Sequence, residues 1–466
     1  MISHGIVIAG AGVAHESAEA LDLMEHAARH AASDAGNAAL LRSIDTIITP
    51  RGTWNYDDPG RALARRVGAD TATTIVGELG VSQQGLMNEA IDLVARRASR
   101  AVLVVGGESR RHNREQPYSE AVGPPDRTMD RPLDFVDPLE IEVGLAFPAV
   151  RSYALIQQAL ASAQGLDDQA SADKTAALWA TFSAVASRNP RAAFGEQRTA
   201  AFLATASRTN QILATPYLRW HASQWSVDQA AALIITSVEH LGALGADPSQ
   251  AIHAHVALES SHVVPLARRR NLASWPAMGV LGHAAGHHLG ISLDDIAHRE
   301  VYSCFPVAVA VQAAELGLST NRDLTLTGGM AFAGGPFNSF VLQSTAAMVP
   351  ALRGDPGSLG LVTTVSGLLT KPGLAVWSTE AYAGGTLSGD LGAEAGRRTA
   401  TIELDPHPSG RLVVETSTTF TDDDGPRGIA FARGADDRRS IISTRDPSLV
   451  ESFSSVEAIG TTISAP

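Results

Sequence analysis

The sequence predicts an α/β protein of two similar halves, with an insertion in the first half and a small all-β domain at the C-terminal end. Three observations favour this fold class. Strand-like and helix-like segments alternate in two successive series, as in sheets whose parallel strands are joined by helices. Polar, proline-containing sequence interrupts the first series over about 108–225. After the glycine-rich segment 382–396, the chain changes to short alternating strands.

The first series begins with a buried strand, and its fourth strand, 100–107, is apolar throughout, as in a sheet covered on both faces. Leu86, Ala90 and Leu93 recur at the spacing of one helix face, which predicts a helix before the fourth strand. The expected strands are 5–13, 43–49, 71–79, 100–107 and 228–237. The other expected helices are 17–35, 59–68 and, inside the insertion, 148–165 and 171–188.

The second series repeats the first, and the tail differs from both. Its expected strands are 251–260, 296–305, 359–367 and 373–379, and its expected helices are 271–288, 306–317 and 337–352. In the tail, "RTATIEL", "RLVVETST" and "GIAFARG" are short strands joined by turn sequences. We therefore expect an N-terminal half at 1–240, a C-terminal half at 241–385 and a β-rich domain at 397–466.

The composition excludes several classes of protein. A net charge of −13 with no basic block argues against nucleic acid as a partner, because a polyanion needs many cationic contacts. A single cysteine, Cys304, excludes an intramolecular disulfide and a cysteine metal cluster. The N-terminal sequence lacks the features of a signal peptide, and no apolar run reaches membrane-spanning length. We expect a cytoplasmic protein with no membrane span.

Two short motifs suggest cofactor or metal sites, and a simpler interpretation is favoured for each. "GAGVAH" (10–15) has two of the three glycines of a dinucleotide-binding fingerprint, but His15 takes the third place, so a tight strand-to-helix turn is the better interpretation. His283 and His287 have the spacing of a metal-binding pair without the glutamate and third ligand of a zinc site. No metal site is predicted.

Two further motifs suggest covalent chemistry. "GVSQQG" (80–85) has the wrong spacing for a nucleophile elbow, so Ser82 is interpreted as the N-cap of a helix. Lys371 offers an amine for a Schiff base, but a lysine between two strands usually lies in a solvated turn.

Taken in order, several segments resemble the thiolase superfamily. "GLMNEAIDLVARRASRAVLVVGGES" (85–109) resembles the helix and strand that follow the acyl-accepting cysteine, and "VDQAAALIITS" (227–237) resembles the family's Ser-Asp-Gly-Ala-Ala strand. "YSCFP" (302–306) stands where sterol-carrier-type thiolases have His-Asp-Cys-Phe. "GGMAFAGGP" (328–336) and "VSGLL" (365–369) stand where thiolases have Gly-His-Pro and Cys-x-Gly.

The resemblance covers residues 1–380. With "NQILATPY" (210–217) and the β-rich tail, the chain is most similar to type 1 thiolase-like proteins, which carry an additional C-terminal domain. The resemblance implies the thiolase fold, which is a duplicated βαβαβαββ unit in five αβαβα layers with a loop domain inserted in the first half.

The resemblance also implies a site in which the thiolase side chains are replaced. In thiolases one cysteine takes the acyl group, the histidine of Gly-His-Pro activates it, and a second cysteine moves a proton. Here Val81 or Ser82 stands at the first cysteine position. Gly335 replaces the histidine, and Val365 or Ser366 replaces the second cysteine. Ordinary thiolase activity is therefore predicted to be absent.

The third motif differs as well. Tyr302 replaces its histidine, and Cys304 matches a motif residue that is not the nucleophile, so we interpret Cys304 as a small buried apolar filler. By position, the candidate catalytic residues are Tyr302, Ser82 and Ser366, and the candidate substrate-binding residues are Cys304, Gly335, Pro336 and Gly329.

Three functions stay open. The first and favoured one is binding of acyl-CoA or a lipid-like acyl ligand without thiolase chemistry. The second is a thiolase-fold acyltransferase or aldolase that acts on acyl-CoA thioesters, with Tyr302 in place of the motif histidine. The third is a scaffold of a lipid-metabolic complex that binds no ligand. Arg188 and Arg208 are candidates to meet CoA phosphates. No bound cofactor is expected, and superfamily habit implies a homodimer, with a monomer as the alternative.

Overall fold

The two predicted halves each form a mixed sheet, and the strands follow one order in both. The computed structural model describes residues 5–112, 122–131 and 133–465. The strands of the first half are β1 (Ile6–Ala14), β2 (Thr46–Pro50), β3 (Thr73–Gly77), β4 (Ala101–Ser109) and β8 (Asp228–Ser237). Those of the second half are β9 (Ile252–Glu259), β10 (His298–Glu300), β11 (Leu359–Ser366) and β12 (Lys371–Ser378). The orders are β3-β2-β4-β8-β1 and β10-β11-β12-β9, with the last strand of each half antiparallel to its neighbours.

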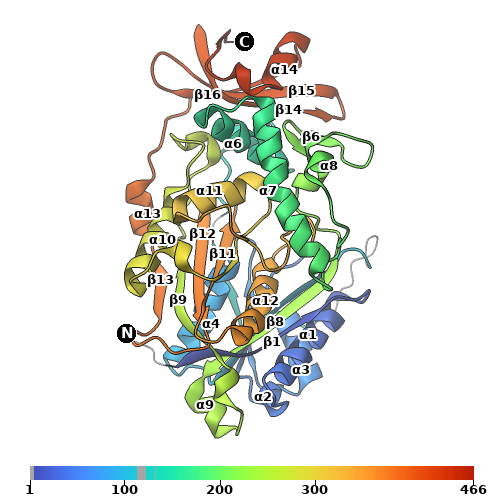
Figure 1. Cartoon of the computed structure of the whole chain (residues 1–466), viewed down its shortest axis with the longest axis vertical. Coiled ribbons are helices and arrows are strands. Elements are labelled where there is room, and N and C mark those ends of the chain that lie inside the picture. The colour runs from blue at the N-terminus through green and yellow to red at the C-terminus, as the bar shows by residue number, and fades with distance from the viewer. Residues whose placement is uncertain (1–4, 113–121, 132, 466) are drawn as a thin grey trace.

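Helices cover the outer face of each sheet and fill the space between the two sheets (Figure 1). The outer helices are α1 (Ala20–Asp34), α2 (Ala39–Arg42) and α3 (Pro59–Val67) on the first half, and α10 (Pro276–Leu289) and α11 (Pro306–Leu316) on the second. The central helices are α4 (Gln83–Ala95) and α12 (Phe340–Gly354). Both contact strands of the two halves, so the body has the five layers αβαβα that the sequence predicts.

The two sheets are not fully separate. Besides its partner β8, β1 also pairs with β9 through two residue pairs, Val7 with His253 and Ile8 with Ile252. The first strand of each half lies at the inner edge of its sheet, so these edges meet and join the strands into one hydrogen-bonded series. The linking segment contains α9 (Val238–Ala243) and the short helix η2 (Pro248–Gln250).

Gly10 and Gly12 lie within β1, which corrects the interpretation of "GAGVAH" as a tight turn. A Cβ atom on Gly10 would stand 2.1 Å from the carbonyl oxygen of Ala31, and one on Gly12 would stand 2.1 Å from that of Ala27. Both carbonyls belong to α1. The glycines therefore allow α1 to pack directly on the strand.

The insertion between β4 and β8 contains several helices, and some of them lie next to the C-terminal module. Its elements are β5 (Arg127–Met129), α5 (Pro138–Glu142), α6 (Val150–Ala163), α7 (Asp168–Arg188), α8 (Ala200–Ala204), β6 (Ile212–Ala214), β7 (Tyr217–Leu218) and η1 (Arg219–His221). β5 pairs with β3 and extends the first sheet. In Figure 1, α7 runs from the C-terminal module down to the body. Residues 113–121 and 132 of the expected insertion lie outside the described residues.

Two expected segments of the second half fold differently. The strand expected at 296–305 is correct only for β10, and the chain then leaves the sheet, with the Val301 amide donating to the Leu324 carbonyl. The expected linker 382–396 holds a strand and most of a helix. These are β13 (Leu387–Asp390), which pairs with β9, and α13 (Gly392–Arg398), which packs on α10. Two more short helices are η3 (Leu266–Arg268) and η4 (Leu293–Asp295).

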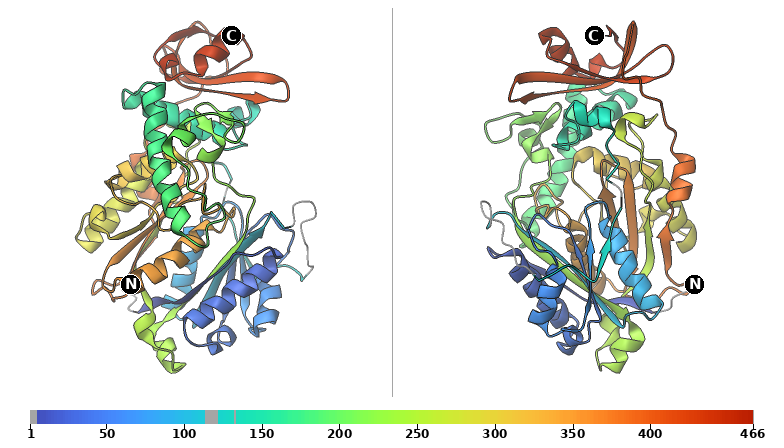
Figure 2. Two further views of the ribbon diagram at one scale, coloured as in Figure 1. Left: turned by 45° about the vertical axis from the view of Figure 1, so that its right-hand side comes forward. Right: turned by 180° about the vertical axis from the view of Figure 1, so that it is seen from behind.

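The C-terminal module is a four-stranded antiparallel sheet with two short helices (Figure 2). Its elements are β14 (Arg411–Asp422), β15 (Gly425–Arg433), β16 (Arg439–Thr444), α14 (Pro447–Phe453), η5 (Val456–Ala458) and β17 (Thr462–Ser464). It is therefore not all-β, and "RTATIEL" forms isolated bridges rather than a strand. β14 packs on α6, and Phe420, Ile429 and Phe431 join the core of the body.

No helix within the described residues has the length and apolar character needed to cross a lipid bilayer.

Candidate functional site

A cavity of about 550 Å³ lies between the insertion and the body. The insertion contributes residues from 133 to 149 and Tyr153 of α6, and the segment before β8 contributes Ser223 and Trp225. The second half contributes the three segments that carry the thiolase-like motifs. The structure therefore brings segments far apart in the sequence to one cavity.

Five of the residues singled out from the sequence line this cavity: Tyr302, Cys304, Gly335, Val365 and Ser366. Local structure explains why they meet. β10 ends at Glu300, so Tyr302 and Cys304 lie in the loop before α11, and β11 ends at Ser366. The cavity therefore lies at the ends of neighbouring strands, where ligands usually bind in open α/β sheets.

Tyr302 presents a phenol whose hydroxyl has no hydrogen-bond partner among the residues that the structure describes. Its backbone is fixed, since its amide donates to Thr363 Oγ1 at 2.9 Å and its carbonyl accepts from Gln312 Nε2 at 2.8 Å. Its ring packs edge-on against Phe340, with the centroids 5.8 Å apart. Burial raises the pKa of the phenol, so the hydroxyl keeps its proton at neutral pH.

Cys304 is half-buried and lines the cavity, so it is not the buried filler that the sequence suggested. Burial raises the pKa of its thiol to about 12, and a hydrogen bond with the Tyr153 hydroxyl only partly opposes the shift. Tyr153 is itself held by stacking on Phe305 at 4.4 Å between centroids. At neutral pH the sulfur is therefore a protonated thiol, which is a weak nucleophile.

Ser223 occupies the space beside Gly335, a feature that the motifs did not predict. A Cβ atom on Gly335 would stand 2.1 Å from Ser223 Oγ and 3.2 Å from Met330 Cε. The position that resembles the thiolase histidine therefore has no room for a side chain while Ser223 keeps this rotamer. The only signal in the sequence was a serine two residues after His221, which carries no recognisable pattern.

Ser82 does not line this cavity. As predicted, it is the N-cap of α4, and its Oγ accepts from the Gly85 amide at 2.9 Å. The same Oγ donates to Glu259 Oε2 at 2.7 Å. Burial raises the pKa of Glu259. Val81, the alternative at this position, is buried in the core and also does not line the cavity.

Lys371 is buried, which corrects the expectation of a solvated turn. Its ammonium group donates to the carbonyl oxygen of Gly80, in the turn before α4. Burial lowers the pKa of Lys371, and nearby carboxylates oppose that shift. The lysine fastens β12 to the start of α4 outside the cavity.

Gly329 and Pro336 shape the loop 328–336 and do not line the cavity. Gly329 has a φ of 75°, and a Cβ atom there would stand 2.6 Å from Phe182, so glycine suits both the backbone and the space.

The buried carboxylate of Glu300 binds the residues just before the loop 328–336. It accepts from the Thr325 and Thr327 hydroxyls and from the Leu326 and Thr327 amides. Burial raises the pKa of Glu300 to about 7.

The mouth of the cavity is apolar. Six of the nine large hydrophobic side chains that are exposed among the described residues gather there. The sixth, Phe147, packs edge-on against Trp225. The five that line the cavity are Leu79, Leu133, Ile141, Trp225 and Phe337. The Arg110 guanidinium lies over the Trp225 ring, 3.7 Å from its centroid, and so places a cation at this rim.

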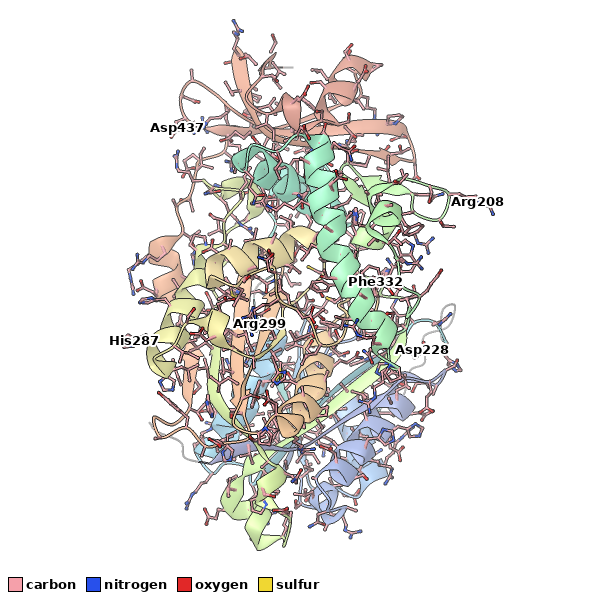
Figure 3. All side chains as sticks on the ribbon, viewed as in Figure 1. Arg208, Asp228, His287, Arg299, Phe332 and Asp437 are labelled. Atoms are coloured by element: carbon pink, nitrogen blue, oxygen red, sulfur yellow. The ribbon has the colours of Figure 1, made fainter. Side chains whose placement is uncertain are left out.

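The other polar candidates lie elsewhere. Arg188 lines a different cavity, and Arg208 projects from the edge of the molecule (Figure 3). His283 and His287 are exposed on α10, with His287 at the surface in Figure 3. No group of three metal-ligating side chains occurs in the described ranges.

Solved structures with the same architecture include three informative cases. A monomeric SCP2-thiolase like protein type 1 from Mycobacterium smegmatis is 28% identical, with a TM-score of 0.87, over 100% of this chain and 97% of that chain. The Ltp2-ChsH2(DUF35) aldolase is 19% identical, with a TM-score of 0.61, over 81% and 99% of the two chains. Human mitochondrial 3-ketoacyl-CoA thiolase is 18% identical, with a TM-score of 0.57, over 82% and 100%. No protein-family model and no curated protein sequence matches the chain.

Proposed function

Since the chain belongs to the thiolase superfamily and is similar over its whole length to a type 1 thiolase-like protein, we propose that it binds thioesters of apolar acyl groups, such as acyl-CoA, without taking the acyl group itself. The observation that supports this most is the open cavity with an apolar mouth and a floor of isolated hydroxyl groups. Such a combination suits a ligand with an apolar body and one polar group.

The floor offers hydroxyl groups rather than a reactive centre. Tyr302, Ser223 and Ser366 all line the cavity and can donate a hydrogen bond to a carbonyl oxygen. The cysteine that lines the cavity, Cys304, is held as a thiol because its pKa is raised to about 12. The proposal therefore assigns these side chains to binding and orientation of the thioester. Ser82 donates to Glu259 outside the cavity and takes no part in chemistry.

Calorimetry with CoA, acetyl-CoA and dodecanoyl-CoA tests this proposal. Each methylene group that enters the apolar mouth contributes about 0.8 kcal/mol, so burial of a few methylenes favours the dodecanoyl ester more than tenfold over acetyl-CoA. The intact mass of the protein should stay unchanged after incubation with either ester. An acyl adduct on Cys304 would overturn the proposal, and failure of every ester to bind would favour a scaffold without a ligand.

A second candidate function is retro-aldol cleavage of a 3-hydroxyacyl-CoA, and the unpartnered Tyr302 hydroxyl favours it. In that reaction the hydroxyl proton passes to a base, the bond between the α and β carbons breaks, and a carbonyl compound leaves. The thioester enolate then takes a proton at the α carbon. The raised pKa of Tyr302 makes the phenol hard to ionise for the first step.

The matched pair for this candidate is the wild-type chain and Tyr302→Phe. Release of a carbonyl product from a 3-hydroxyacyl-CoA by the wild type, and its loss in Tyr302→Phe, would support the aldolase function. Binding of the same ester without cleavage by either protein would leave binding as the function.

We also propose that the protein is a monomer, as the M. smegmatis protein is described. In this chain β5 pairs with β3 and covers the edge strand of the first half. The edge strand is then β5, which has only 3 residues, and so short an edge disfavours a sheet shared with a second copy. Light scattering coupled to size exclusion should give the mass of one chain, and the mass of two would contradict this.

A further inference from the structure

Gln83, the first residue of α4, lines the cavity of the proposed acyl site, although its neighbour Ser82 does not. Only 4% of Gln83 is exposed, so a polar side chain is held inside the protein at the wall of a cavity. Buried polar groups in folded proteins have hydrogen-bond partners. The partners of the two ends of the Gln83 amide therefore determine what this side chain can do.

The oxygen end of the amide caps α12. Gln83 Oε1 accepts from the backbone amide of Val341, in the first turn of that helix, at 2.7 Å. The first N–H groups of a helix lack partners within the helix, and the N-cap residue Ser339 makes no side-chain bond to them. Because the Val341 group is a donor, the atom that faces it must be the amide oxygen. The orientation of the Gln83 amide is thus fixed.

The nitrogen end of the same amide is free. Gln83 Nε2 donates no hydrogen bond to any residue in the described ranges, and the protein does not seal this atom from solvent. Since the residue lines the cavity and is otherwise buried, Nε2 opens into the cavity. An amide whose oxygen already accepts a hydrogen bond is also a stronger donor at its nitrogen. The cavity therefore has a donor of fixed direction that lacks an acceptor.

This donor differs from the hydroxyl groups in the same cavity. The hydroxyls of Tyr302, Ser223 and Ser366 rotate, and each can accept as well as donate. Gln83 Nε2 can only donate, in the direction that the helix cap imposes. The ring of Tyr302 packs on Phe340, the first residue of α12. The start of α12 thus anchors both the fixed donor and the phenol.

We propose, on the basis of the function proposed above, that Gln83 Nε2 donates to the carbonyl oxygen of the bound acyl thioester and so fixes where this carbonyl lies. A carbonyl oxygen suits the place because it accepts hydrogen bonds and has no hydrogen to clash with the amide. The site then selects a ligand with an acceptor at this point over a ligand of the same length without one. Gln83 is thus a residue that determines specificity, and no covalent bond forms or breaks at it.

Calorimetry with dodecanoyl-CoA and S-dodecyl-CoA tests this inference. The second ligand is a thioether in which a methylene group replaces the carbonyl, so the two ligands have the same charges. The ratio of the ester affinity to the thioether affinity should fall at least about fivefold from the wild type to Gln83→Glu. This variant keeps an oxygen to cap α12 but turns an acceptor toward the carbonyl. Gln83→Met, which lacks the donor and adds no charge, should lower the ratio in the same direction.

Two other variants serve as controls. Gln164→Glu adds the same charge at the exposed end of α6, outside the cavity, and should keep the wild-type ratio. Tyr302→Phe should lower the ratio less than Gln83→Glu does. An unchanged ratio in both Gln83 variants, or a larger loss in Tyr302→Phe, would overturn the inference and leave ester binding standing. Failure of the wild type to bind either ligand would contradict the proposed function itself, and this inference with it, so the two failures are distinguishable.

Discussion

The segments that lead into the two central helices differ in what they present. Ahead of α4, Ser82 turns away from the cavity and bonds Glu259 of the other half. Ahead of α12, Gly335, Phe337 and Asn338 line the cavity, and no side chain projects from the first of them. From the sequence, both segments were expected to stand where thiolases carry reactive side chains. Here the first serves as a structural contact between the halves and the second as a wall of a cavity.

This difference indicates which residues can be replaced without disturbing the contacts between the two halves. The Ser82 to Glu259 bond and the Lys371 to Gly80 bond both join the start of α4 to strands of the second half. Groups that carry such contacts are costly to replace. The residues that line the cavity make few such bonds, so a substitution there should change ligand binding more than the stability of the fold. The predictions below test that contrast, beginning with the largest expected effect.

Ser82→Ala should lower the free energy of unfolding by about 2–4 kcal/mol, since it removes a helix N-cap and leaves a largely buried carboxyl group without a donor. Urea unfolding measures the change. The affinity for dodecanoyl-CoA should stay within twofold of the wild type. Ser366→Ala is the matched control, a serine that lines the cavity, and it should change stability by about 0.5 kcal/mol or less. A larger loss of stability in Ser366→Ala than in Ser82→Ala would reverse the contrast.

Glu300→Gln should remove a pH dependence of stability. The pKa of Glu300 in the folded state is raised to about 7 from its ordinary value of 4.5. The folded state therefore binds more protons between these values, and Glu300 makes the wild type lose stability as pH rises through that window. The shift corresponds to roughly 3 kcal/mol.

Unfolding at several pH values between 4.5 and 7.5 checks this. His15 and His221, whose pKa values are lowered to about 4, act in the opposite direction in both proteins. The difference between wild type and Glu300→Gln therefore isolates the carboxyl group. A difference that stays constant across the window would contradict the expected role of Glu300.

Gly335→Ala should destabilise the protein by about 1–3 kcal/mol, because the new methyl group overlaps Ser223. It should also weaken ester binding, since Ser223 must move into the cavity. Adding Ser223→Gly to Gly335→Ala should restore most of the stability. If the double variant is no more stable than Gly335→Ala, the space is limited by something other than the serine.

Cys304→Ala should affect stability less than Ser82→Ala, Glu300→Gln or Gly335→Ala. A small side chain that lines a cavity leaves little void when shortened, so stability should fall by about 1 kcal/mol or less. Ester affinity should stay within twofold, because the protonated thiol is given no part in chemistry. A tenfold loss of affinity, or loss of a measured activity, would assign Cys304 a direct role.

The sequence predicts the architecture well because strands and helices of the body have clear apolar patterns. The segment 228–237 forms a strand over its whole length, and Ser82 caps α4 as its sequence indicates. Predictions were wrong where contacts with distant segments determine the local structure. Residues 301–305 have the composition of a strand but leave the sheet at the cavity, and the segment 382–396 looks like a linker but adds a strand to β9.

The site was only partly predictable for a related reason. Motif positions identify Tyr302 and Ser366 as neighbours, because the strand ends that carry them lie together in the fold. Motif positions do not show that Ser82 faces Glu259, nor that Ser223 takes the space beside Gly335. Those contacts join segments more than a hundred residues apart, and no local pattern encodes them.

The central claim is that the cavity takes the apolar part of an acyl thioester, and tryptophan fluorescence tests it most directly. Trp225 stands at the mouth of the cavity and is exposed. Titration with dodecanoyl-CoA should give a saturable change that Trp225→Phe removes, and acetyl-CoA should need at least a tenfold higher concentration to reach the same change. No saturable change with dodecanoyl-CoA, or an unaltered change in Trp225→Phe, would contradict the claim.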